Sequence, residues 1–136
     1  MEYRDVTIAS SSRFYDRVRS VLKVLQSHGL TCYTPDFDFD ETTVVVSPEQ
    51  KHRLTLAFLK KIQASEALYV IDTNGYTGTS VCLEVGYAYA LEKRIYTVES
   101  PSEPAIAALV KEVIDPEDLA KLLSGSATSR TFRTQE

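Results

Sequence analysis

Cysteine and histidine are scarce in this chain of 136 residues, and long apolar runs are absent. The two cysteines, Cys32 and Cys82, lie far apart and lack the spacing of metal ligands, so neither a zinc finger nor a disulfide-stapled secreted protein is expected. No stretch approaches the roughly 18 consecutive apolar residues that a membrane span requires. The first residues, MEYRDVTIAS, lack the apolar segment of a signal peptide. These absences predict a cytoplasmic protein with free thiols.

Positive charge is also in deficit. The chain has 15 Lys and Arg residues against 19 Asp and Glu residues, a net charge of −4. This balance argues against a protein that mainly binds duplex nucleic acid or an anionic membrane, although it leaves room for a local basic site. Hydrophobic residues make up 43% of the chain and charged residues 25%, which is the composition of an ordinary globular domain.

Strand-like and helix-like patterns alternate along the chain. The predicted strands cover residues 6–9, 31–34, 67–71 and 94–98, the predicted helices cover 14–25, 48–62 and 80–91, and elements that are at least partly helical are expected over 101–114 and 116–123. This alternation predicts a single-domain α/β fold with a mostly parallel open sheet flanked by helices, a Rossmann- or flavodoxin-like three-layer sandwich. We expect the domain to span residues 1–124 and a mobile C-terminal tail to span residues 125–136.

Glu84 is the only charged residue in the stretch VCLEVGYAYAL, residues 81–91. A helix that is apolar on nearly every side is normally buried all round, and a carboxylate inside it is costly unless it is paired or functional. We expect the positive end of the helix dipole to keep Glu84 ionised, as a nucleophile or an electrostatic stabiliser requires. The alternative is a glutamate that caps its own helix or pairs with an arginine.

Asp72 ends the predicted strand 67–71, where the chain opens into a turn with two glycines over residues 73–79. An aspartate in this place is often only a turn-former that bonds to the backbone. Ligands of open parallel sheets bind beyond the carboxyl ends of the strands, so we expect the turn and the next helix to bring Asp72 and Glu84 into one crevice. Two neighbouring carboxylates are the acid/base pair of glycoside cleavage.

A polar segment with Ser10, Ser11, Ser12 and Arg13 follows the first predicted strand. Hydroxyls and backbone N–H groups at a helix start can bind an anion, and Arg17, one turn after Arg13, could add charge. The alternative is that the serines only cap the helix. The aromatic residues in or beside these loops, on which a planar base could stack, are Phe14, Tyr15, Phe37, Phe39 and Tyr76. Ordinary packing is the alternative for all of them, and we prefer it for Phe14.

Signals for a metal or a catalytic triad are weak. The acidic run DFDFDE, residues 36–41, lacks the glycine and glutamate of a calcium loop and is interpreted as a hydrated loop. His28 and His52 have no ligand residue nearby, and no serine–histidine or cysteine–histidine arrangement is legible. We therefore predict no metal site and no cofactor.

The segment DTNGYTGTS, residues 72–80, followed by LEVGYA, residues 83–88, resembles the nucleoside 2-deoxyribosyltransferase-like family, which includes 2′-deoxynucleoside 5′-monophosphate N-glycosidases. The resemblance extends over residues 6–98. It implies that Glu84 is the nucleophile, which attacks the anomeric carbon, and that Asp72 binds the sugar or assists protonation of the leaving base. It also implies a small-molecule nucleoside or nucleotide as partner, and a homodimer or larger homo-oligomer with shared active sites.

The predicted substrate-binding residues come from the polar segment and from the turn that carries the resemblance. They are Ser10, Ser11, Ser12, Arg13, Tyr15, Asn74, Gly75, Tyr76, Gly78 and Ser80. Together with Glu84 and Asp72 they make up the predicted site.

Three functions remain open at this point. Cleavage of an N-glycosidic bond is preferred, with hydrolysis favoured over base transfer, because the acidic and asparagine residues that the transferases contribute near their C-terminus have no counterpart here. A non-catalytic nucleotide-binding or sensor domain on the same fold is the alternative. A phosphoribohydrolase of the cytokinin-activating type is disfavoured, because Cys82 stands where those enzymes carry a glutamate.

Overall fold

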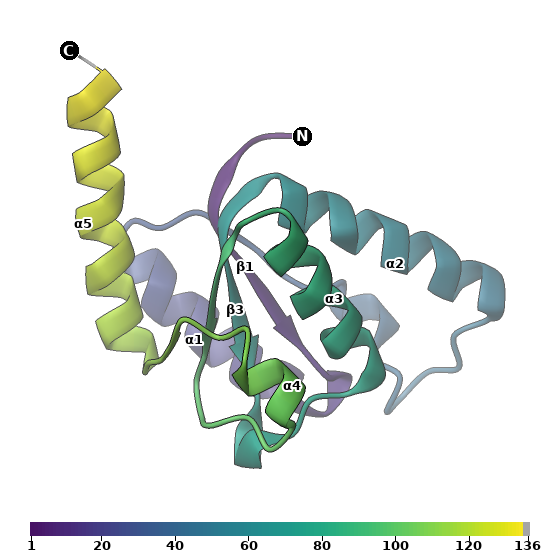
Figure 1. Cartoon of the computed structure of the whole chain (residues 1–136). Coiled ribbons are helices and arrows are strands. Elements are labelled where there is room, and N and C mark those ends of the chain that lie inside the picture. The colour runs from purple at the N-terminus through teal and green to yellow at the C-terminus, as the bar shows by residue number, and fades with distance from the viewer. Residues whose placement is uncertain (135–136) are drawn as a thin grey trace.

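A five-stranded parallel sheet forms the centre of the molecule (Figure 1). The structure is a computed structural model, which describes the backbone of residues 1–134 and the side chains of residues 1–125. The strands are β1 (Arg4–Ser10), β2 (Cys32–Tyr33), β3 (Ser65–Ile71), β4 (Arg94–Thr97) and β5 (Glu112–Val113). They pair in the order β2-β1-β3-β4-β5, and every pair is parallel, so the predicted sheet type is confirmed.

Helices pack on both faces of this sheet and complete the three-layer sandwich (Figure 1). They are α1 (Tyr15–Ser27), α2 (Pro48–Gln63), α3 (Thr79–Ala90), α4 (Pro104–Ala107) and α5 (Pro116–Thr134), with the 3-10 turns η1 (Ser12–Phe14), η2 (Phe37–Phe39) and η3 (Thr73–Gly75). One buried cluster joins β1 and β3 to α1 and α5, and a second joins the same strands to α2 and α3.

β3 lies between β1 and β4 and is covered on both faces. Its side chains alternate between the two buried clusters, so that Leu68 and Val70 pack toward α2 and α3 while Tyr69 and Ile71 pack toward α1 and α5. Burial on both faces is the reason that this strand reads as one continuous apolar run. Ser10 pairs with Ile71, so β1 and β3 end at the same level and the segments that follow them begin at one edge of the sheet.

The start of α2 is determined by a capping box. Ser47 Oγ accepts a hydrogen bond from Gln50 N at 3.1 Å, and Gln50 Oε1 accepts one from Ser47 N at 2.9 Å. Pro48 occupies the first helical position, as predicted. These local interactions fix the residue at which α2 begins.

α3 departs from the sequence expectation. The helix is not buried all round, because Leu83 and Tyr89 on it are 54% and 58% exposed. α3 forms part of an outer layer, so only the stripe that faces the sheet reaches the core. The sequence patterns also do not predict β5, whose residues 112–113 are exposed and pair with β4 alone.

α5 continues to Thr134 and therefore runs through most of the segment 125–136, for which a mobile tail is expected. The mobility of that segment remains a prediction, and residues 135 and 136 lie outside the described residues. Between residues 1 and 134, no helix combines the length and the apolar character that a membrane crossing needs.

Candidate functional site

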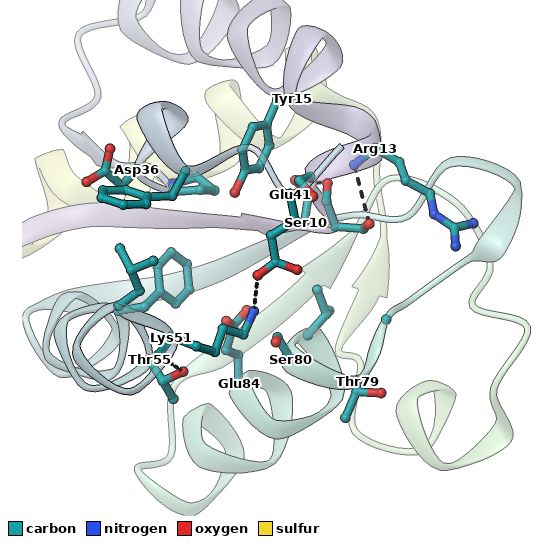
Figure 2. A pocket seen from close by; sticks show the side chains of 18 of the residues that line it. Ser10, Arg13, Tyr15, Asp36, Glu41, Lys51, Thr55, Thr79, Ser80 and Glu84 are labelled. Carbon is teal, nitrogen blue, oxygen red and sulfur yellow. Dashed lines mark hydrogen bonds and ion pairs between the residues drawn. The ribbon is translucent and has the colours of Figure 1, made fainter. Parts of the chain in front are cut away.

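A cavity of about 650 Å³ opens at the carboxyl edge of the sheet (Figure 2). Five parts of the chain enclose it: the polar segment after β1, the loop between β2 and α2, one face of α2, the segment between η3 and α3, and the start of α3. Open parallel sheets bind their ligands at this edge, and a cavity of this size accommodates a small organic molecule.

Nine of the twelve predicted site residues line this cavity. They are Ser10, Ser11, Ser12, Arg13, Tyr15, Tyr76, Gly78, Ser80 and Glu84. Asp72, Asn74 and Gly75 do not line it. The structure thus brings the polar segment and Glu84 together, and it places the beginning of the turn after β3 outside the cavity wall.

Glu84 lies in the second turn of α3 and lines the cavity (Figure 2). Burial raises the pKa of its carboxyl group to about 8, and the positive charge of Lys51 offsets this effect only in part. The expectation that the helix dipole keeps Glu84 ionised is therefore wrong. The dipole acts mainly within the first turn, and at the position of Glu84 the loss of water outweighs it. The acid form predominates at neutral pH.

Tyr15 is the first residue of α1 and lines the cavity together with Glu84 (Figure 2). Burial, followed by the negative charges of Asp40 and Glu41, raises the pKa of Tyr15 to about 12, so the phenol keeps its proton. The Phe37 ring packs edge-on against Tyr15, with 5.3 Å between the ring centres. This contact orients a hydroxyl group that can donate a hydrogen bond to a ligand.

Asp72 is fully buried at the end of β3. Its Oδ1 accepts a hydrogen bond from Glu99 N at 2.9 Å, which joins the ends of β3 and β4. Its Oδ2 has no hydrogen-bond partner among the residues whose side chains are described. Burial raises the pKa of Asp72 to about 6, against the hydrogen bond from Glu99 N. The side chain makes no capping hydrogen bond in its own turn, so Asp72 is not the turn-former of the alternative interpretation. Its Oδ1 links β3 to the segment after β4, and its Oδ2 can bind a further partner.

Asn74 and Gly75 shape the turn after β3 and have φ angles of 59° and 77°. A Cβ atom on Gly75 would lie 2.7 Å from Ser100 O, so only glycine fits. Gly75 O accepts hydrogen bonds from Ser102 N at 3.0 Å and from Ser102 Oγ at 2.9 Å. Asn74 N donates to Glu99 Oε2 at 3.2 Å. These two predicted substrate contacts bind the segment after β4 instead of lining the cavity.

The polar segment after β1 is organised as a helix start. Ser11 Oγ accepts a hydrogen bond from Arg13 N at 3.4 Å and caps η1, and Ser10 Oγ donates to Ser11 O at 2.9 Å. The guanidinium carbon of Arg13 lies 4.3 Å from the centre of the Tyr76 ring, a cation–π contact. Hydroxyl groups and one cation therefore face the cavity from this side.

Arg17 is not placed where the anion-site hypothesis needs it. Its Nη1 lies 2.9 Å from Glu99 Oε2 and 2.9 Å from Thr73 Oγ1, and it does not line the cavity. The side chain joins α1 to the segments after β3 and β4. Of the two arginines considered for an anion, only Arg13 reaches the cavity.

Sequence reasoning missed the charged residues that α2 and the loop before it contribute. Lys51 Nζ forms an ion pair with Glu41 Oε1 at 2.6 Å, and both residues line the cavity (Figure 2). Lys61 also lines it and donates to Thr34 O at 2.8 Å, and burial lowers the pKa of this ammonium group. A signal was present in the spacing, because Lys51, Phe58 and Lys61 recur on one face of a helix.

This chain is similar to known proteins in structure. No family model matches the chain, and no curated protein matches it. A conserved protein from Enterococcus faecalis V583 superimposes with a TM-score of 0.68 and 14% identity, covering 91% of this chain and 99% of that one. A 2-deoxyribosyltransferase from Bacillus psychrosaccharolyticus superimposes with a TM-score of 0.59 and 20% identity, covering 84% and 90%. The chain therefore has the fold of a nucleoside 2-deoxyribosyltransferase, which the resemblance of residues 72–88 predicts.

Proposed function

We propose that this protein cleaves the N-glycosidic bond of a nucleoside or a nucleoside 5′-monophosphate, with Glu84 as nucleophile. The observation that carries the proposal is the lone carboxyl group of an apolar helix, which lines a cavity of about 650 Å³ at the carboxyl edge of a parallel sheet. The shared fold with a 2-deoxyribosyltransferase supports a nucleoside as the substrate class.

The reaction proceeds in two displacements at the anomeric carbon. In the first, the Glu84 carboxylate forms a bond to this carbon, the electrons of the carbon–nitrogen bond pass to the base, and the base takes up a proton as it leaves. In the second, water forms a bond to the same carbon, the ester bond to Glu84 breaks, and one proton of the water is released. The products are the free base and the free sugar or sugar phosphate, and the carboxylate is restored.

The cavity walls have chemistry suited to such a substrate. Tyr15 keeps its proton and can donate a hydrogen bond to the sugar or the base. Tyr76 offers a ring face for the base, although Arg13 occupies one side of that ring. The hydroxyl groups and N–H groups of Ser10–Ser12 are assigned to a 5′-phosphate, with Arg13 as the cation.

We assign Asp72 one of two roles: it donates a proton to the leaving base, or it binds the sugar. In either role it would act through Oδ2, which has no hydrogen-bond partner among the residues whose side chains are described. With a pKa of about 6, a minor fraction of this carboxyl group is protonated at neutral pH and can donate a proton to the base. Because Asp72 does not line the cavity, this role requires the turn after β3 to move when the substrate binds.

A homodimer with shared active sites belongs to the same proposal. Leu83 and Tyr89 expose apolar surface on α3, and Leu83 precedes the proposed nucleophile in the chain. A second copy packed on this surface would lie next to the cavity.

A non-catalytic nucleotide-binding domain is the second candidate, and the raised pKa of Glu84 favours it, because a protonated carboxyl group is a poor nucleophile. The deciding experiment is chromatographic detection of free base from a panel of nucleosides and 5′-monophosphates, each with and without a second acceptor base.

Release without acceptor establishes hydrolysis, and release only with acceptor establishes transfer. Glu84→Gln should abolish release while binding of the substrate is retained. Saturable nucleotide binding with no release from any substrate would overturn the catalytic proposal and support the binding domain.

A further inference from the structure

An ion pair crosses the cavity next to Glu84. Lys51 lies in the first turn of α2 and Glu41 in the loop between η2 and α2, and 2.6 Å separates Lys51 Nζ from Glu41 Oε1. In Figure 2 the dashed line joins Lys51 to Glu41, and Glu84 projects into the same cavity from α3. Both side chains of the pair are close to half exposed, so the pair contributes little to the stability of the fold. Its position beside the proposed nucleophile is therefore its main consequence.

Several charged or titratable side chains from other elements line the same cavity as Glu84. They are Arg13, Tyr15, Asp36, Glu41, Lys51 and Lys61. Among these cations, Arg13 lies over the Tyr76 ring and Lys61 donates to a backbone carbonyl. Lys51 is the cation whose charge acts on Glu84, where it opposes the effect of burial on the pKa.

We propose that Lys51 is a positioning residue, which holds Glu84 as a carboxylate when it is released from Glu41, and that Glu41 competes with Glu84 for this ammonium group. The inference rests on the proposed role of Glu84 as nucleophile. One ammonium group that is paired at 2.6 Å with one carboxylate is only partly available to another. A substrate that separates Glu41 from Lys51 would therefore charge the nucleophile at the moment it is needed.

The test measures the ionisation of Glu84 in the free protein, without any substrate. A carbon-13 NMR titration follows the Glu84 carboxyl signal, which is assigned by its loss in Glu84→Gln. We expect Lys51→Gln to raise the pKa of Glu84 by about 1 unit, and Glu41→Gln to lower it by about 1 unit. Lys51→Arg should restore the wild-type pKa to within about 0.5 units, because it keeps the charge.

Matched controls remove the same charges from exposed positions of α2 that do not line the cavity. Lys60→Gln and Glu49→Gln should shift the pKa of Glu84 by less than about 0.3 units, because solvent screens exposed charges. An unchanged pKa in both Lys51→Gln and Glu41→Gln would overturn the proposal, and so would equal shifts in the controls.

The titration also separates this inference from the proposed function. If bases are released, the pH dependence of kcat/KM should shift in the same directions as the NMR titration. If no substrate releases a base, the proposed function fails. The pKa values of Glu84 in the wild type and in the variants still decide whether Lys51 and Glu41 control its ionisation.

Discussion

Burial raises the pKa of both Glu84 and Asp72. The two carboxyl groups nevertheless have different surroundings, which suit them to different roles. Glu84 lines the cavity, and the charge that acts on it comes from Lys51. Asp72 Oδ1 accepts a hydrogen bond from Glu99 N, so Asp72 also stabilises the edge of the sheet. A substitution at Glu84 should change chemistry and leave the fold intact, whereas a substitution at Asp72 acts on both.

Glu84→Gln should make the protein more stable at alkaline pH. The pKa of Glu84 is about 8 in the folded protein, against an ordinary value of 4.5. Between these values the folded state holds a proton that the unfolded chain has lost, so the free energy of unfolding falls as pH rises through this window. Glutamine does not titrate, and the variant should gain about 2–4 kcal/mol over wild type near pH 8.5 and much less near pH 5.

The measurement is thermal unfolding of wild type, Glu84→Gln and the exposed control Glu49→Gln at both pH values. A difference between wild type and Glu84→Gln that is equal at the two pH values would show that Glu84 ionises normally in the folded state.

Asp72→Asn and Asp72→Ala should differ in stability. Asparagine retains an oxygen that can accept the hydrogen bond from Glu99 N, whereas alanine leaves this buried N–H group without its acceptor. The alanine variant should therefore lose about 1–3 kcal/mol relative to the asparagine variant in urea unfolding at neutral pH. Equal stability of the two variants would mean that the link between β3 and β4 contributes nothing. Lost activity in a stable asparagine variant would support a chemical role for the carboxyl group.

At the scale of elements, the turn after β3 depends on one glycine. Gly75→Ala places a Cβ atom 2.7 Å from Ser100 O at a φ angle of 77°, and should destabilise the protein by about 2 kcal/mol or more. Gly86→Ala is the matched control. A Cβ atom on Gly86, within α3, meets nothing within 4 Å, and this change should stabilise the protein by about 0.5–1 kcal/mol. Opposite shifts in the unfolding midpoint are expected, and shifts of the same sign would contradict the close approach at Gly75.

The elements that sequence predicts well are those whose signal is local. β3 reads as an apolar run because both of its faces are covered, and Pro48 marks the start of α2. β5 is two exposed residues that pair only with β4, so nothing in its own composition reveals it.

The same distinction applies to the site. Glu84 can be predicted as a site residue because it is the only charged residue in an apolar helix. The contact of Lys51 with Glu41 depends on how a loop folds over α2. It is a tertiary contact, which no local sequence pattern predicts. The ion pair of Arg17 with Glu99 is also a tertiary contact. The sequence pattern instead predicted that Arg17 would add positive charge to an anion site.

At the scale of the whole molecule, the exposed apolar residues of α3 should be covered in solution. We expect light scattering at micromolar concentration to give twice the mass of the chain. Leu83→Glu should shift the protein toward the monomer, because it places a charge in an apolar interface. Val113→Glu, an exposed apolar position on β5, is the control and should leave the mass unchanged. A monomer mass for the wild-type protein would contradict the shared-site proposal.

The strand order has a further consequence for how the molecule opens. β1, β3 and β4 are the inner strands, each with a neighbour on both sides. The polar segment after β1 and the turn after β3 continue directly from two of them. The opposite wall comes from the loop between β2 and α2, whose residues 41–45 are exposed. In hydrogen–deuterium exchange, amides of β1 and β3 should be the last to exchange and those of residues 40–46 among the first. The cavity wall built from the segments after β1 and β3 would then stay in place while the loop between β2 and α2 opens and closes. Ligands would enter and leave past this loop, which carries Glu41.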